Sequence, residues 1–374
     1  MTTDELKSAT TGYGLAVGTP RLKSIGPITF SPDGILFVAD SANATIYAID
    51  VRDTDAPSQS QPVEVDNLDV RLAAYMACTR DDILIRDMAV HPTSMAVYLS
   101  LVRGRGGSAI PLLIRIGEGS SLREVSLEGV PFSQAVIEDA PGDDDERLDT
   151  RVVLGDREGE EIEVRGIRLR LARDKLRTST VTDMAFVDGI LLVAGASNEE
   201  FSSTLRRIPF PFEDEARTNS LEIFHVSHGR YETASPIRTF VPYGDNLSVL
   251  ASYTCTPVVH FSVGDLKSGT QAKGRTVADL GAMNTPIDIV AYQRGGEEYV
   301  LVSNTRHPLL KMACADIDRQ EPLTHPQQPV GVPREALHQQ GVSRMASANG
   351  AYVLMLQQDE AGDLHLRSYD SDSL

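Results

Sequence analysis

The chain has 374 residues, 41% of them hydrophobic, and its 53 acidic and 35 basic residues give a net charge of −18 at pH 7. This acidity argues against nucleic acid and anionic membranes as partners, because both need a basic surface. No apolar run approaches the roughly 20 residues of a membrane-spanning helix. The three cysteines are widely spaced and the first residues lack the order of a secretory signal. We therefore expect a cytoplasmic protein without a disulfide framework.

The predicted elements begin with residues 12–18, which alternate like a β-strand. Residues 28–40 then show a pattern that recurs along the chain: a short β-rich run, a turn at Asp33-Gly34 and a more hydrophobic run. Residues 183–194 repeat it with a turn at Asp188-Gly189. The first strand of this unit recurs at 25–28, 85–88, 181–184, 237–239, 286–289 and 342–345.

Repeats of this length predict a ring or an array of like units. The units are about 50 to 60 residues apart, and a degenerate copy at 129–178 fills the one larger gap. We therefore expect an all-β fold, one seven-bladed β-propeller domain over residues 1–374, with six blades as the alternative. The predicted blades are 20–67, 80–128, 129–178, 179–232, 233–280, 281–335 and 336–374, with a helical insert at about 68–78.

The two ends of the chain predict how the ring closes. The last unit stops after its third strand, at 364–369, and so lacks an outer strand. The strand at 12–18 precedes the first complete unit and can supply that missing strand. Such closure would pair backbone groups that otherwise remain exposed at a sheet edge. We therefore expect 12–18 to complete the last blade.

The first unit resembles the NHL, YVTN and gluconolactonase-like group of β-propellers, in which Pro-Asp-Gly is followed by an aromatic-rich strand that ends in Asp. The resemblance implies a propeller architecture. In the gluconolactonase-like enzymes an acidic metal ligand precedes Gly-Pro of a first strand, whereas this chain has Ile25 there. The residues that carry the resemblance are Pro32, Asp33, Gly34, Phe37, Val38, Ala39, Asp40, Ser41, Ile46, Tyr47 and Ile49.

Polar residues recur where first strands begin. Asp87, Asp183 and Asp288 take equivalent positions in three units, and Arg238 and Arg344 lie at or near that position in two others. The carboxylates could bind a metal or transfer protons, and the arginines could clamp an anionic substrate. Alternatively, these residues form an ion-paired belt that holds the first strands in register.

Two of the eight histidines are candidates for the same site. His307 lies in a loop on the polar face and suits a ligand or general base. His260 is expected to point into the channel from a third strand. His225 and His228 are three residues apart in a predicted strand and should therefore face opposite sides, which argues against a metal pair.

Two functions follow from these patterns. The first is a hydrolase or lyase that acts on a small anionic metabolite at the channel mouth and is assisted by a divalent metal ion. The second is a non-catalytic scaffold that binds a protein or another ligand. For the enzyme, the predicted catalytic residues are His307, Asp183, Asp288 and Glu199, the substrate-binding residues are Arg86, Arg238, Arg306, Arg344, Tyr253 and Asn304, and the metal ligands are Asp183, Asp288, His307 and His260.

Overall fold

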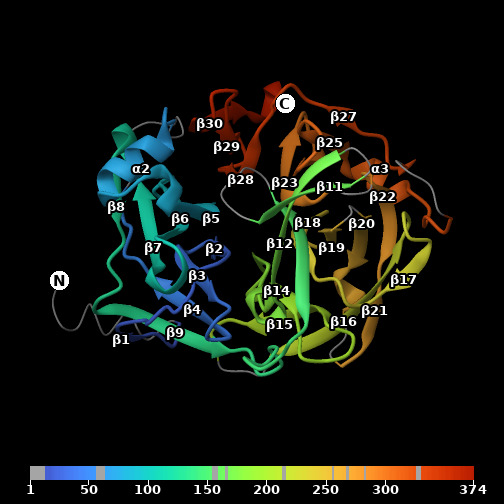
Figure 1. The fold of residues 1–374 in the computed structure, drawn as a ribbon, viewed down its shortest axis with the longest axis horizontal. Coiled ribbons are helices and arrows are strands. Elements are labelled where there is room, and N and C mark those ends of the chain that lie inside the picture. Colours follow the sequence, from blue (N-terminus) through green and yellow to red (C-terminus); the bar gives the residue numbers. More distant parts are fainter. Residues whose placement is uncertain are drawn as a thin grey trace.

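The structure is a computed structural model that describes residues 13–55, 64–153, 159–164, 167–212, 216–254, 257–266, 269–281, 284–325 and 330–374. In these residues, six sheets of mainly antiparallel strands radiate from a central channel as the blades of a β-propeller (Figure 1). The second strand of a blade is buried between neighbouring blades, so runs such as Ile190–Ala196 are continuously apolar. None of the described helices is long and apolar enough to cross a membrane.

The blades are numbered here in the order of their first strands, and each is given from the channel outward. Blade 1 contains β2 (Ile28–Phe30), β3 (Ile35–Asp40), β4 (Thr45–Asp50), β9 (Val130–Val136) and β1 (Ala16–Gly18). Blade 2 contains β5 (Ile83–Val90), β6 (Val97–Arg103), β7 (Ile110–Ile116) and β8 (Leu122–Glu124). Blade 3 contains β13 (Asp183–Val187), β14 (Ile190–Ala196), β15 (Ser203–Pro209), β16 (Arg217–His225) and β17 (Arg230–Glu232), with β21 (Gln271–Lys273) parallel to β16.

The second half of the ring comes from the C-terminal part of the chain. Blade 4 contains β18 (Ile237–Tyr243), β19 (Ser248–Tyr253), β20 (Pro257–Ser262), β22 (Arg275–Asp279) and β26 (Val330–Gly331). Blade 5 contains β23 (Pro286–Arg294), β24 (Glu297–Asn304), β25 (Leu310–Ala313) and β27 (Glu335–Ala336), with α3 (Cys314–Arg319) after β25. Blade 6 contains β28 (Val342–Ala348), β29 (Tyr352–Gln358) and β30 (Leu364–Asp370).

The order of the blades in space differs from their order in the chain. The inner strands make contact in the closed sequence β2, β5, β28, β23, β18, β13 and back to β2, so blade 1 lies between blades 2 and 3. After blade 2 the chain returns through β9, which pairs with β4 at the outer side of blade 1. Each neighbouring pair of blades shares a cluster of buried hydrophobic side chains. The core is thus divided into six wedges around the channel.

The blade predicted at 129–178, third in chain order, does not form in the described residues. Its first part is β9 of blade 1, and its second part is a separate three-stranded sheet of β10 (Leu148–Val153), β12 (Ile167–Lys175) and β11 (Glu160–Val164). We call this three-stranded sheet the inserted sheet. The repeat pattern in this region was degenerate because these strands do not occupy the buried positions of a blade. Among the described residues, six inner strands contact one another in the ring.

The predicted closure by the N-terminal strand is wrong. β1 pairs with β9 at the outer edge of blade 1, where Ala16 lies opposite Phe132. Blade 6 is instead extended by Val65. Its N–H donates to the carbonyl of Leu366 at 3.0 Å, and its carbonyl accepts the N–H of Leu366 at 2.9 Å. The alternating pattern of 12–18 identifies a strand but does not select its partner, because that depends on where the chain ends in space.

The helical insert predicted at 68–78 corresponds to α2 (Leu68–Met76). Its buried face carries Leu68 and Leu72 into the cluster shared by blades 2 and 6. The buried Asp69 on the same helix is paired with Arg80 at 2.6 Å. The helix therefore covers the junction where the last blade meets blade 2 (Figure 1).

A close backbone approach in blade 3 allows a test of the packing. Gly195 in β14 lies against the carbonyl oxygen of Thr180, which a Cβ at Gly195 would approach to 2.1 Å. We expect Gly195→Ala to lower the free energy of unfolding by about 1–3 kcal/mol, as measured by urea denaturation. Gly107→Ala is the control, because a Cβ there meets nothing within 4 Å. Equal losses in the two variants would contradict the predicted clash.

Candidate functional site

The central channel is the main candidate site. It encloses about 360 Å³ and is lined by all six inner strands. Many of its lining residues are apolar, with Met88, Met184 and Met345 contributed by three different blades, but polar atoms make up more of its exposed surface than apolar atoms. Three carboxylates, those of Asp87, Asp183 and Asp288, also line it, and we refer to them as the aspartate ring. The predicted equivalence of these three positions therefore corresponds to a shared place in the structure.

Each carboxylate of the aspartate ring joins two neighbouring blades. One oxygen accepts the N–H of the next residue in its own strand at 2.8 Å. The other oxygen reaches a backbone N–H of the adjacent inner strand. These contacts connect blade 2 to blade 1, blade 3 to blade 4 and blade 5 to blade 6, which repeats one arrangement three times around the ring. The partners are Ile28 for Asp87 at 2.8 Å, Phe240 for Asp183 at 2.7 Å and Met345 for Asp288 at 2.5 Å.

Local backbone irregularity turns two of these side chains toward their neighbours. The register of β5 shifts between Ile85 and Asp87, and that of β23 shifts between Pro286 and Asp288. A bulge of this kind inserts one residue and re-aims the next side chain. The inner strands can therefore place an aspartate beside the N–H of an adjacent blade.

The aspartate ring is an unfavourable place for negative charge. Burial raises the pKa of all three carboxyl groups. Repulsion from Asp87 and Asp288 raises the pKa of Asp183 further. Burial and the charge of Asp87 raise the pKa of Asp288 to about 7, although Arg344 opposes this shift. Because burial and nearby acidic groups would disfavour any further negative charge, a neutral or cationic group fits the channel better than the predicted anionic substrate.

The predicted substrate-binding arginines are engaged within the protein. Arg238 forms a bidentate pair with Asp149 of the inserted sheet and also donates to the Thr254 hydroxyl at 2.7 Å. Arg344 donates from Nε to the carbonyl of Arg86 at 2.7 Å, and its Nε lies 3.9 Å from Asp87. These contacts hold inner strands and the inserted sheet together, and Arg238 is not aimed at an open substrate position.

The loop that follows β24 is also internally bonded. The Oδ1 atom of Asn304 accepts the backbone N–H of Arg306 at 3.2 Å and that of His307 at 2.7 Å. The ring nitrogen Nε2 of His307 lies 3.0 Å from the carbonyl oxygen of Leu280. These three residues of the predicted site therefore lie together in one loop, and Asn304 orders it.

Tyr253 and Glu199 take different positions from those expected of a shared site. Tyr253 is buried at the end of β19, and burial raises the pKa of its hydroxyl. Glu199 is exposed, and its backbone carbonyl accepts a hydrogen bond from Arg147 at 2.7 Å. None of Tyr253, Glu199 and His307 is among the residues that line the described channel.

The predicted metal ligands do not come together. His260 lies in β20, the third strand of blade 4, with its Nε2 3.1 Å from the hydroxyl of Ser248. A third strand lies away from the channel, so His260 does not point into it as predicted. Within the described part of the chain, Asp183, Asp288, His307 and His260 do not form a group of ligand atoms close enough to share an ion.

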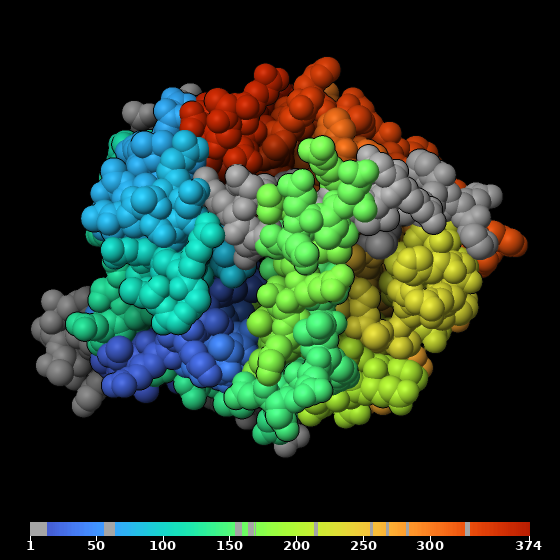
Figure 2. Space-filling model, in the orientation of Figure 1, coloured from blue at the N-terminus to red at the C-terminus, as the bar shows by residue number. Residues whose placement is uncertain are grey.

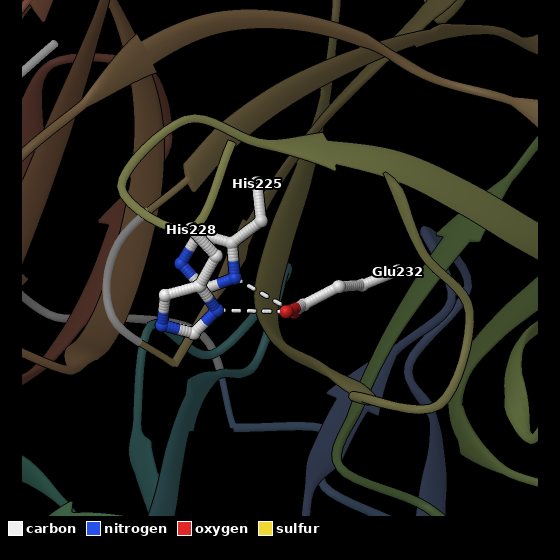
Figure 3. Close-up of side chains that lie close together, drawn as sticks. All are labelled: His225, His228 and Glu232. Atoms are coloured by element: carbon white, nitrogen blue, oxygen red, sulfur yellow. Dashed lines mark hydrogen bonds and ion pairs between the residues drawn. The ribbon is translucent and has the colours of Figure 1, made fainter. Parts of the chain in front are cut away.

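A different group of metal-ligand type forms at the edge of blade 3 (Figure 3). His225, His228 and Glu232 place one possible ligand atom each within 4.8 Å of the others. The prediction that the two histidines face opposite sides was wrong, because β16 ends at His225 and His228 lies in the following turn. Gly229, with φ of 64°, was the local signal of that turn.

The carboxylate of Glu232 is charged at neutral pH. Burial raises its pKa, but hydrogen bonds from His225 and His228 outweigh burial and lower the pKa to about 2. The two imidazole Nδ1 atoms each lie 2.7 Å from one of its oxygens. Arg230 contributes a third contact at 3.0 Å from its Nε. The group is thus an ionised carboxylate shared by two imidazoles.

The inserted sheet, green in Figure 2, crosses the middle of the ring face seen in that view. Its strand β10 is anchored by Asp149, which pairs with Arg238 and accepts from the hydroxyl of Ser179 at 2.5 Å. The side chains of Asp149 and Arg238 are only 5% and 8% exposed. The N–H of Val152 also donates to the hydroxyl of Thr285 at 3.2 Å. The polar groups of this channel mouth therefore serve to dock the inserted sheet.

Comparison with known proteins leaves the family open. No family model and no curated protein matches the chain. The β-propeller domain of Myceliophteria thermophila Cps50 (Swd1) is 11% identical, with 92% of this chain and 83% of that chain covered and a TM-score of 0.39. U3-55K is 9% identical, with 94% and 97% covered and a TM-score of 0.38. The PQQ-bound aldose sugar dehydrogenase from Streptomyces coelicolor is 13% identical, with 95% and 98% covered and a TM-score of 0.37. At these TM-scores the likeness carries no argument, and the fold rests on the strand pairing described above.

Proposed function

We propose that this chain is a non-catalytic binding scaffold of the cytoplasm that engages a protein partner through its outer surface. The observation that carries the proposal is the use of the aspartate ring: both oxygens of each carboxylate accept backbone N–H groups. Carboxylates held in this way stabilise the ring and have little freedom to act on a substrate. Rigid rings with exposed loops are well suited to binding other proteins.

Two further features favour a scaffold. Arg238, a predicted substrate-binding residue, instead forms a buried ion pair with Asp149. The inserted sheet that this pair anchors crosses the ring face (Figure 2). The net charge of −18 favours a partner that presents a basic surface, since complementary charge accelerates association and guides orientation. The resemblance of blade 1 to the NHL, YVTN and gluconolactonase-like group concerns architecture and assigns no activity.

The second candidate function is the predicted hydrolase or lyase. One observation favours it: the pKa of Asp288 is raised to about 7, which would let this group exchange protons at neutral pH. A divalent metal at Asp183, Asp288, His307 and His260 would require these residues to move together. The enzyme therefore needs a rearrangement that the scaffold does not.

The two candidates are separated by Asp183→Asn, with Asp188→Asn as its matched control. Both residues belong to the β13–β14 hairpin, but Asp188 is an exposed turn residue with φ of 47°. A tagged full-length chain would be expressed in a deletion strain of the source organism, and growth, Tm and the native mass of the assembly measured. The scaffold predicts an assembly clearly larger than 40.6 kDa that both variants retain.

The enzyme predicts a different result. In that case Asp183→Asn, folded at the temperature of the assay, fails to support growth, whereas Asp188→Asn supports it. A wild-type chain that migrates alone at its own mass in the native extract would also contradict the scaffold. Comparing both variants at a temperature well below their Tm separates loss of function from loss of folding.

A further inference from the structure

The edge of blade 3 carries a compact group of nitrogen and oxygen donors outside the channel. β16 ends at His225, and β17 returns along it so that Glu232 lies opposite Ile223. Residues 223 and 225 lie on the same face of the strand, so Glu232 is brought to the side on which His225 projects. The hairpin itself therefore places a carboxylate beside an imidazole.

The turn adds the second imidazole. The N–H of His228 donates to the carbonyl of His225 at 3.1 Å, and the N–H of Gly229 donates to the same carbonyl at 2.8 Å. This folding-back stacks the two imidazoles, with ring centroids 3.9 Å apart and planes inclined by 32°. Both Nδ1 atoms then point at Glu232, as Figure 3 shows.

One imidazole of this group is buried, and the other is partly open to solvent. The side chain of His225 is 4% exposed and that of Glu232 is 16% exposed, whereas that of His228 is 43% exposed. The Nε2 atom of His225 is buried and has no hydrogen-bond partner among the described residues. The buried carboxylate of Asp279 accepts the N–H of Ser227, between the two histidines, at 3.2 Å. Asp279 thus holds the backbone of the turn that connects the two histidines.

We propose that His225, His228 and Glu232 bind a divalent transition-metal ion of the zinc type, with the remaining coordination position open to solvent. Two imidazole nitrogens and one carboxylate oxygen are a known donor set for zinc, which takes a water as its fourth ligand in such sites. Binding would replace two hydrogen bonds by coordination of Nδ1, Nδ1 and one carboxylate oxygen. The ring protons of the two Nδ1 atoms move to Nε2 or to solvent. Arg230 also contacts the carboxylate, and because its side chain is 70% exposed it can move aside.

The test is zinc binding by the intact chain. The protein would be stripped with chelator, loaded with Zn²⁺, passed through a desalting column and analysed for metal, with affinity measured by competition against a chromophoric chelator. We expect one zinc per wild-type chain and a loss of affinity of at least about tenfold in His228→Ala and in Glu232→Gln. His338→Ala removes an exposed histidine elsewhere and should bind zinc as the wild type does.

Cobalt provides a second measurement, because its visible absorption reports the coordinating atoms. We expect a visible band in the Co²⁺-loaded wild type that His228→Ala removes while its Tm without metal stays close to that of the wild type. Absence of stoichiometric zinc from the folded wild type would overturn the proposal. So would full zinc retention by both His228→Ala and Glu232→Gln. Asp183→Asn should keep the metal, so this result is independent of the scaffold test.

Discussion

The stability advantage of the wild type over Asp288→Asn is expected to shrink by about 3 kcal/mol between pH 5 and pH 8. Asp288 has a pKa of about 7 in the folded chain against 3.8 in its ordinary state. The folded state therefore holds this proton more tightly than the unfolded state. The stabilisation by that proton is complete below pH 3.8 and is lost as the pH rises through about 7. Asparagine cannot titrate, so the variant does not lose this stabilisation as the pH rises.

The measurement is urea denaturation of both proteins at several pH values, with the difference in unfolding free energy followed against pH. At pH 5 Asp288 is protonated in the folded chain, and the hydroxyl oxygen of its carboxyl group can still accept one of the N–H groups of Ile289 and Met345. The NH2 group of asparagine cannot accept, so the variant should be the less stable at this pH. Asp188→Asn should follow the wild-type profile throughout. Parallel curves for the wild type and Asp288→Asn would contradict the raised pKa.

Titrating groups outside the aspartate ring cancel in this difference. Burial lowers the pKa of His91 and His260, so their contribution has the opposite sign and grows as the pH rises toward 6.5. Glu232 and Asp53 have pKa values of about 2, and the stability that they supply above their ordinary values of 4.5 and 3.8 is lost only in more acidic solution. The comparison between variants therefore isolates the aspartate ring.

Replacing Arg238 by methionine is expected to cost about 3–5 kcal/mol of unfolding free energy, because it leaves the carboxylate of Asp149 buried without its cation. The pair is buried on both sides, at 8% and 5% exposure. The remaining partner of Asp149 is the hydroxyl of Ser179. The inserted sheet should then separate more readily from the ring, and amide hydrogen exchange in β10 and β12 should accelerate.

The matched control is Arg170→Met in the same sheet. Arg170 pairs with Glu161 at 3.3 Å, and their side chains are 27% and 54% exposed. A pair as exposed as this contributes at most about 1 kcal/mol, so this variant should stay close to the wild type in both measurements. Unchanged hydrogen exchange of β10 in Arg238→Met would show that the buried pair does not anchor the sheet.

Much of the architecture was accessible from the sequence. The Asp-Gly turns at Asp33 and Asp188, each followed by a run of apolar residues, identified strands and a repeating unit, because turn geometry and burial of a central strand depend on neighbouring residues. Alignment of the units also brought Asp87, Asp183 and Asp288 into register, and the structure gives them the same role. Their hydrogen-bond partners are backbone N–H groups, which have no signature in the sequence. Of the arginines of the predicted belt, Arg344 forms an ion pair with Asp87 at 3.9 Å, whereas Arg238 pairs with Asp149.

The errors concern partners that lie far apart in the chain. Of the strand predicted at 12–18, only Ala16–Gly18 forms one among the described residues. This strand, β1, pairs with β9, whose own position depends on the chain returning to blade 1 after blade 2. The segment 129–178 was assigned to one blade because strand propensity does not reveal which sheet a strand joins.

In the candidate sites, too, the sequence determined the chemistry of the groups, and the tertiary structure determined which groups meet. Residue identity determined which groups can carry charge, coordinate a metal or accept a proton, and local pattern determined that they lie on strands and turns. Only the tertiary structure decided that Arg238 meets Asp149, that Asp288 shares its channel with two other carboxylates, and that His228 folds back onto His225. These contacts depend on how blades and turns pack, and packing is set by the summed burial of many side chains that are distant in sequence.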